Sequence, residues 1–232
     1  KAKLSQQDEI SWYLSTLNEE DKNDLEGLIL QYNKPVGADV KTVVCIPANM
    51  EALNIYQTLT QYSQQKDLRG NVLDPKTYEI VVFDNRTADS IRDNTKEEIQ
   101  RFMKDHPDMN IITIEQVFPT RPSIGRVRRN LTNFVFKRLE NRSVATTDVV
   151  LVSNDADTIE LPQTYLATIA DTFTNNQTLD AVTGRYDFPA EAYKNFPVLF
   201  ATERAWQLMD AIVRHNEQSA IPQLMGANSA LR

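Results

Sequence analysis

Two aspartates follow directly after an apolar run in the second half of the chain. Val149 to Val152 consists of β-formers, and Asp155 and Asp157 come shortly after it. A buried strand carries no charge along its length, so acids at its carboxyl end lie where open α/β sheets bind ligands. Two such carboxylates stand about 6–7 Å apart along an extended chain. Their hard oxygens suit Mg²⁺ or Mn²⁺ shared with substrate phosphates, although two solvated acids at a strand end would show the same pattern.

Two upstream apolar runs also end in acids. The run that finishes Ile46-Pro47-Ala48-Asn49-Met50-Glu51 precedes a predicted helix. Pro47 is expected to stop the strand, and the helix N-terminus favours the carboxylate of Glu51, so capping alone would explain this residue. The next run, residues 78–83, ends at Asp84. A carboxylate there can accept a hydrogen bond from an N–H group of a ligand.

Three arginines lie near the start of another predicted helix. Arg126, Arg128 and Arg129 all stand in its first turns. Cations have the wrong sign for the positive end of the helix dipole. They are tolerable if an anion such as a diphosphate binds there, and a solvated basic face is the alternative.

These residues sit in a chain where short apolar runs alternate with segments of 3.6-residue periodicity. The predicted strands span residues 41–46, 78–83, 110–114, 148–153 and 180–184, and the predicted helices span 51–66, 89–105, 124–140, 161–174 and 202–216. This alternation predicts an α/β fold, with a mainly parallel central sheet and helices on both faces. A pair of helices within residues 5–32 precedes it. We therefore expect an N-terminal helical extension, 1–36, and one larger domain, 37–232.

Composition narrows the class of protein. The chain has 232 residues, a formal charge of −7 and 41% hydrophobic residues. The acidic balance argues against a general nucleic-acid or anionic-membrane binder, and no apolar stretch is long enough for a transmembrane segment. Cys45 lies in an apolar run, where it is expected to be a core residue. A single cysteine excludes an intrachain disulfide and fits a reducing compartment, so we expect a cytoplasmic protein.

Taken together, the motifs resemble those of nucleotide-diphospho-sugar transferases with the GT-A fold, in particular glycosyltransferase family 2. That family has an Ile-Pro-Ala-x-x-Glu turn, an Asp-Asn-x-Ser/Thr-x-Asp strand end, an Arg-Asn helix, an Asp-x-Asp strand end and a Gly-x-Asn-x-Ala-x-Arg segment. The corresponding segments here are, in order, residues 46–51, 84–89, 129–130, 155–157 and 226–232. The resemblance covers about residues 40–232.

Carried over position by position, the resemblance implies a donor site. Pro47, Ala48 and Glu51 would line the nucleoside pocket. Asp84 would bind a uracil-like base, and Arg129 would lie near the base or the diphosphate.

The remaining motif residues imply a metal and a sugar site. Asp155 would contact the ribose or the metal, Asp157 would bind a Mn²⁺ or Mg²⁺ ion that bridges both phosphates, and Gly226 and Asn228 would lie near the transferred sugar. The implied activity is metal-dependent transfer from a UDP- or GDP-sugar, with inversion. The acceptor, whether a sugar, a lipid or a small molecule, stays open.

The catalytic base is not assigned by the resemblance. In the family a Glu-Asp pair follows the Gly-x-Asn segment, and here it would fall beyond Arg232. Asp187 and Glu191 are weak alternatives, because both could be ordinary loop acids. We therefore expect residues 1–232 to bind a nucleoside diphosphate with metal but to transfer sugar poorly.

Two other functions compete with transfer. A sugar-1-phosphate nucleotidyltransferase would have a Gly-rich loop with a basic residue after the first strand, whereas the turn at residues 47–51 has an acid and no glycine. A non-catalytic binding module of the same fold is the second alternative. The pair Asp155 and Asp157 opposes it, and the missing base favours it.

Overall fold

The computed structural model describes residues 5–142, 148–184, 190–198, 201–202, 205 and 229–231. Within these residues the chain forms a six-stranded sheet of order β3-β2-β1-β4-β6-β5. Its strands are β1 (Thr42–Ala48), β2 (Tyr78–Thr87), β3 (Ile111–Phe118), β4 (Val150–Ser153), β5 (Ala181–Thr183) and β6 (Ser229–Leu231). Its helices are α1 (Gln6–Ser15), α2 (Glu19–Gln31), α3 (Ile55–Ser63), α4 (Thr95–Asp105), α5 (Ile124–Glu140), α6 (Tyr165–Asn175) and α7 (Ala190–Asn195), with a 3₁₀ turn at Pro75–Thr77.

The sheet is mainly parallel, as the alternation of strands and helices predicted. β1 pairs in parallel with both β2 and β4, and β2 pairs in parallel with β3. Among the described strands, β6 runs antiparallel to both of its neighbours, β4 and β5. The carboxyl ends of β1, β2, β3 and β4 therefore meet along one edge of the sheet.

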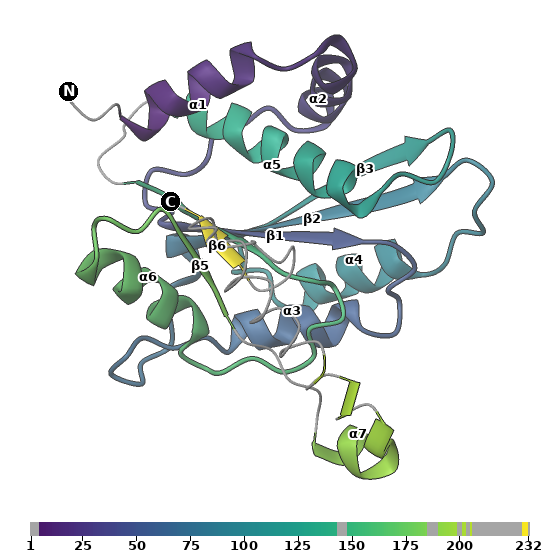
Figure 1. Cartoon of the computed structure of the whole chain (residues 1–232), viewed down its shortest axis with the longest axis vertical. Helices are drawn as coiled ribbons and strands as arrows, with labels where there is room; N and C mark the ends of the chain where they lie inside the picture. Colours follow the sequence, from purple (N-terminus) through teal and green to yellow (C-terminus); the bar gives the residue numbers. More distant parts are fainter. Residues whose placement is uncertain are drawn as a thin grey trace.

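Both faces of the sheet are buried. Along β1, Val43 and Cys45 enter one apolar core, and Val44 and Ile46 enter the other. Helices cover each face, with α1, α2 and α5 on one side and α3, α4 and α6 on the other (Figure 1). Cys45 is buried, and burial raises the pKa of its thiol to about 12, which agrees with the expected core role.

The N-terminal helices form as predicted and belong to the first layer. Ser5 and Asp8 make a reciprocal capping box at the start of α1, and Asn18 caps α2. Apolar side chains of this pair join the core on the α5 side of the sheet: Ile10 of α1, Leu17 between the helices, and Leu25 and Leu28 of α2. The pair therefore helps to cover the sheet.

Several element boundaries differ from the predictions. Pro47 does not stop β1, which continues to Ala48. The pairing of β1 with β4 ends at Cys45, so the missing N–H of Pro47 breaks no bond to β4. α3 begins at Ile55 and α4 at Thr95, both later than expected, because turns replace their first residues.

Strand β6 was not predicted at all. The helix expected at 202–216 lies almost entirely outside the described residues.

No helix in the described part of the chain has the length and apolarity to cross a bilayer.

Candidate functional site

Two asparagines fasten the ends of β1 and β2 to each other. The side-chain amide of Asn49 donates to the carbonyl oxygen of Asn85 at 2.8 Å. In return, the amide of Asn85, which is buried, donates to the carbonyl oxygen of Ala48 at 2.8 Å. This exchange satisfies backbone groups beyond the last rungs of the ladder, so the two strand ends keep a fixed relative position.

The turn after β1 is held by the segment before α4. The backbone N–H of Glu51 donates to Thr95 Oγ1 at 2.7 Å, and that of Ala52 donates to Asp93 Oδ2 at 3.1 Å. Met50 adopts a φ of 59°, a left-handed conformation that is uncommon for a residue with a side chain. These bonds hold the turn so that Glu51 lies at the rim of the sheet, where it accepts a bond from Asn54 Nδ2 at 3.1 Å.

The turn after β4 presents the two aspartates. Asn154 is buried, and its side chain donates to Tyr62 Oη at 2.9 Å. Ala156 is also buried, and its carbonyl accepts a bond from Thr58 Oγ1 at 2.7 Å. Because residues 154 and 156 are anchored inside, the residues that alternate with them, Asp155 and Asp157, remain accessible to solvent.

Glu51 shares an electrostatic environment with both aspartates. Burial raises the pKa of Glu51, and the charges of Asp157 and Asp155 raise it further. Burial also raises the pKa of Asp155, Arg128 opposes this rise, and Asp157 adds to it. The turns after β1 and β4 thus bring three carboxyl groups close enough for the charges of Asp155 and Asp157 to disfavour the ionisation of Glu51.

These carboxylates fit a cation that also binds a ligand. Among the residues that the structure describes, no group of three or more His, Cys, Asp or Glu side chains is arranged to hold a metal ion. Magnesium-type sites at phosphate-binding centres use one or two carboxylates, with the rest of the shell from phosphates and water. Asp155 and Asp157 supply hard oxygen ligands of this kind, and Asp157 is exposed. The donor set fits Mn²⁺ or Mg²⁺ in company with a phosphate.

Arg128, and not Arg129, contacts one of these aspartates. Arg128 forms an ion pair with Asp155 and donates to Ser153 Oγ at 3.2 Å. Arg129 instead pairs with Asp21 of α2 at 3.0 Å, on the other side of α5. The sequence motif had pointed to Arg129 because it precedes an asparagine. The rotation of α5 about its own axis decides which arginine reaches the strand ends.

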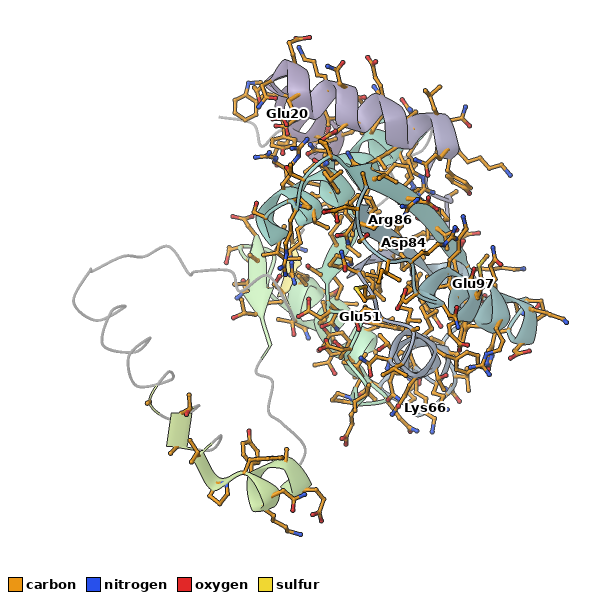
Figure 2. All side chains as sticks on the ribbon, turned by 90° about the vertical axis from the view of Figure 1, so that its right-hand side faces the viewer. Glu20, Glu51, Lys66, Asp84, Arg86 and Glu97 are labelled. Carbon is orange, nitrogen blue, oxygen red and sulfur yellow. The ribbon has the colours of Figure 1, made fainter. Side chains whose placement is uncertain are left out.

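Asp84 lies in a second, mixed-charge cluster at the ends of β2 and β3. β2 continues past it, and its register neighbours are Ala48 on β1 and Glu115 on β3. Burial raises the pKa of Asp84, Glu115 raises it further, and Arg92 lowers it. Figure 2 shows Asp84 beside Arg86, with Glu51 on the same side of the molecule.

Cations of this cluster are directed to Glu115, and a hydrogen-bonded acid lies close by. Lys96 and Arg86 approach Glu115 at 3.0 and 3.6 Å. Asp93, whose charge also raises the pKa of Asp84, accepts bonds from Thr95 and the backbone of Ala52. These bonds outweigh its burial and lower its own pKa. Asp84 is thus the carboxyl group of the cluster that these cations do not pair with directly.

The remaining expected residues fall in different places. Pro47 and Ala48 are buried within β1, so their side chains face the core. Glu191 is exposed on α7, pairs with Lys194 at 3.0 Å, and α7 lies apart from the sheet (Figure 1). Three further site residues, Asp187, Gly226 and Asn228, lie outside the described residues.

Two residues of the site were not singled out from the sequence. Arg128 was seen only as one of three arginines, and nothing in the sequence separates it from its neighbours. Asp93 has the signal of an Asx turn, in which an aspartate side chain accepts a hydrogen bond from the backbone two residues on, here the N–H of Thr95 at the start of α4.

No protein-family model matches the chain, and no curated protein matches its sequence significantly. Its structure is similar to that of a mannosyltransferase from Pyrobaculum calidifontis in complex with GDP-Man and Mn²⁺, with 17% identity, 78% of this chain covered and a TM-score of 0.45. It is also similar to glucosyl-3-phosphoglycerate synthase from Mycobacterium tuberculosis, with 14% identity, 91% covered and a TM-score of 0.49.

A complex of that synthase with Mn²⁺, UDP-glucose and phosphoglyceric acid gives 16% identity over 90% of this chain, with a TM-score of 0.46. The chain spans only 48% of the mannosyltransferase structure and 60–61% of the synthase structures. At such low identities and TM-scores the likeness assigns no activity to this chain.

Proposed function

We propose that this chain binds a nucleoside-diphosphate sugar, UDP- or GDP-linked, together with a divalent cation, as the donor part of a glycosyltransferase. The observation that carries the proposal is the convergence of Glu51, Asp155 and Asp157 at the carboxyl ends of β1 and β4. Open parallel sheets bind ligands at this edge. Carboxyl groups whose negative charges oppose one another, as those of Asp155 and Asp157 oppose the charge of Glu51, form a suitable place for a cation.

The residues of the proposed site contact different parts of the donor and its cation. Asp155 and Asp157 hold the cation, and Asp84 accepts a hydrogen bond from an N–H of the base. Arg128 supplies a guanidinium group beside them, which matches phosphate oxygens. The cation would neutralise the negative charge that develops on the departing nucleoside diphosphate. We assign no catalytic base, since Glu191 is on α7, away from this edge.

Calorimetric titration of UDP and GDP tests the proposal. With Mn²⁺ present, at least one of them should bind, and binding should largely disappear when EDTA replaces the metal. UMP, which lacks the second phosphate, should bind more weakly than UDP because it cannot share the cation between two phosphates. If neither diphosphate binds in Mn²⁺, the edge of the sheet is not a donor site and a non-catalytic module becomes the better interpretation.

The nucleotidyltransferase alternative finds no support in the first turn. Residues 49–54 contain no basic side chain and no glycine, and the acid there, Glu51, would repel the triphosphate that such an enzyme must bind.

A further inference from the structure

The three arginines of α5 are divided between two sides of the helix. Arg126 and Arg129 are three residues apart and share one face, whereas Arg128 lies on the opposite side. α2 binds the first two, since Arg126 pairs with Glu20 and Asp24 at 2.7 Å each and Arg129 pairs with Asp21 at 3.0 Å. These ion pairs fix the orientation of α5 about its own axis. In this orientation the side chain of Arg128 reaches Asp155.

Arg128 is well sheltered where it meets Asp155. Its side chain is 18% exposed, while that of Asp155 is 41% exposed. Nη1 donates to Ser153 Oγ at 3.2 Å and Nη2 pairs with Asp155. Nε is buried and has no hydrogen-bond partner among the described residues. The guanidinium group thus keeps one donor that its contacts with Ser153 and Asp155 leave unsatisfied.

The ion pair changes what Asp155 offers to a cation. When all three groups are ionised, Arg128, Asp155 and Asp157 carry a net charge of −1, which becomes −2 without the arginine. Guanidinium occupies Asp155 Oδ1, so a metal ion must compete with it both for the charge and for one oxygen. Nucleotide binding would end this competition, because the phosphates of the nucleotide are better partners for the planar guanidinium group of Arg128 than one partly exposed carboxylate.

We propose that Arg128 excludes the divalent cation from Asp155 until a nucleoside diphosphate arrives, and that it then exchanges Asp155 for the phosphate oxygens. This inference rests on the proposed function and adds an order of binding to it. Linkage requires the reciprocal effect, so the nucleotide should strengthen metal binding by the same factor as the metal strengthens nucleotide binding.

Measuring Mn²⁺ alone separates this role from ordinary ligand binding. Free Mn²⁺ is followed by its EPR signal, and UDP binding in Mn²⁺ by calorimetry, for the parent and Arg128→Gln. We expect Arg128→Gln to bind Mn²⁺ alone on the order of tenfold more tightly, the scale of a modest coupling. The same variant should bind UDP in Mn²⁺ more weakly. Opposite changes for the two ligands are not expected from a residue that only supports the fold.

Lys137→Gln is the matched control, since it removes one positive charge from the same helix more than two turns beyond Arg128, where Lys137 pairs with Glu140. It should leave the affinity for Mn²⁺ alone unchanged. Should Arg128→Gln fail to fold, Arg128→Lys retains the charge but cannot hold Asp155 and Ser153 together. It should then show a smaller rise in Mn²⁺ affinity and weaker UDP binding.

Two failures can be told apart. If the parent binds neither UDP nor GDP in Mn²⁺, the proposed function itself is wrong. If the parent binds UDP in Mn²⁺, but Arg128→Gln and the parent bind Mn²⁺ alone equally, the exclusion by Arg128 is overturned and the donor site stands. Equality of Arg128→Lys and the parent in both measurements would overturn it in the same way.

Discussion

At the scale of single residues, the site is a set of carboxyl groups held where ionisation is unfavourable. The pKa values of Glu51, Asp84 and Asp155 are all raised, with burial as the largest cause in each case. Such groups stabilise the fold when protonated and lose this contribution as the pH rises through their folded-state pKa. The chain therefore keeps charges at this edge that cost stability at neutral pH, as expected where a cation or a polar ligand binds.

Asp157 tests the metal part of the site. Asp157→Asn should abolish the Mn²⁺ dependence of UDP binding, because it removes an anionic ligand, while the melting temperature stays close to that of the parent, because Asp157 is exposed. Calorimetry in Mn²⁺ and in EDTA, with thermal unfolding followed by circular dichroism, measures both effects. Asp108→Asn, an exposed acid just before β3 at the opposite edge of the sheet, is the control. Lost stability with unchanged nucleotide binding would make Asp157 a purely structural residue.

Asp84 tests the link between the site and stability. Asp84→Asn should increase the free energy of unfolding at pH 7, because the folded state disfavours the ionised form of Asp84. This effect is opposite to that expected for a carboxylate with a lowered pKa, whose replacement would decrease the free energy of unfolding. As the pH falls through the raised pKa towards 3.8, the ordinary value, the parent takes up its proton and the advantage of the variant should shrink.

Urea unfolding at several pH values measures this difference, and calorimetry should show weaker UDP binding by the same variant. The substituted side chain would keep an acceptor oxygen but lose the charge, and a hydrogen bond to a charged group exceeds a neutral one by about 1 kcal/mol. A variant that is less stable at pH 7 and binds UDP as the parent does would remove Asp84 from the site.

At the scale of elements, periodicity predicted the layers but not the ends of the strands. The apolar parts of β1, β2, β3 and β4 are recognisable because both faces are buried. The last residues of β2 are polar and read as a loop, yet Asn85 and Arg86 pair in register with Gln116 and Val117 of β3. β6 has only three residues, Ser229–Leu231, too few to show a period. Its place between β4 and β5 depends on long-range pairing that local pattern does not contain.

The orientation of α5 about its own axis could not be predicted from the sequence either. Asp155, Asp157 and Glu51 could be placed at one edge from strand ends alone. Choosing Arg128 over Arg129 requires the contacts of α2, in particular Asp24, which accepts bonds from Gln116, Arg126 and Asn130.

This role of Asp24 gives a prediction at the element scale. Asp24→Ala should lower the free energy of unfolding by about 1–3 kcal/mol, because it leaves partly buried polar groups without their partner. Glu26→Ala, on the exposed side of the same helix, should change it by no more than about 0.5 kcal/mol. Urea unfolding of both variants measures the difference. Equal stabilities would show that the contacts between α2 and α5 contribute little.

At the scale of the whole molecule, the N-terminal helices and the sheet share one core. The side-chain amide of Gln6 makes two bonds of 2.9 Å with the backbone of Val149, just before β4. Arg138 of α5 is buried against Glu79 of β2 and also donates to the carbonyl of Lys34, in the segment that follows α2. These contacts tie the first layer to strands that carry the site. We therefore expect the helical pair and the sheet to unfold together, although the sequence suggested a boundary near residue 36.

Removing the pair tests this expectation. A chain of residues 35–232 loses four buried side chains, Ile10, Leu17, Leu25 and Leu28, each worth about 1.5–3 kcal/mol of burial. Together they are comparable with the whole stability of a typical domain, about 5–15 kcal/mol. The shortened chain should therefore show no cooperative urea transition by circular dichroism and no binding of UDP in Mn²⁺.

A milder pair of substitutions, which keeps the fold intact, also tests whether the helical pair and the sheet unfold together. Leu28 is 1% exposed and Leu30, on the same helix, is 88% exposed. Leu28→Ala should cost about 2–5 kcal/mol of unfolding free energy, whereas Leu30→Ala should cost almost nothing. Both probes, circular dichroism for the helices and UDP binding for the site, should then report one urea midpoint in Leu28→Ala. Separate midpoints, or a shortened chain as stable as the parent, would mean that the helical pair is an independent unit resting on the sheet.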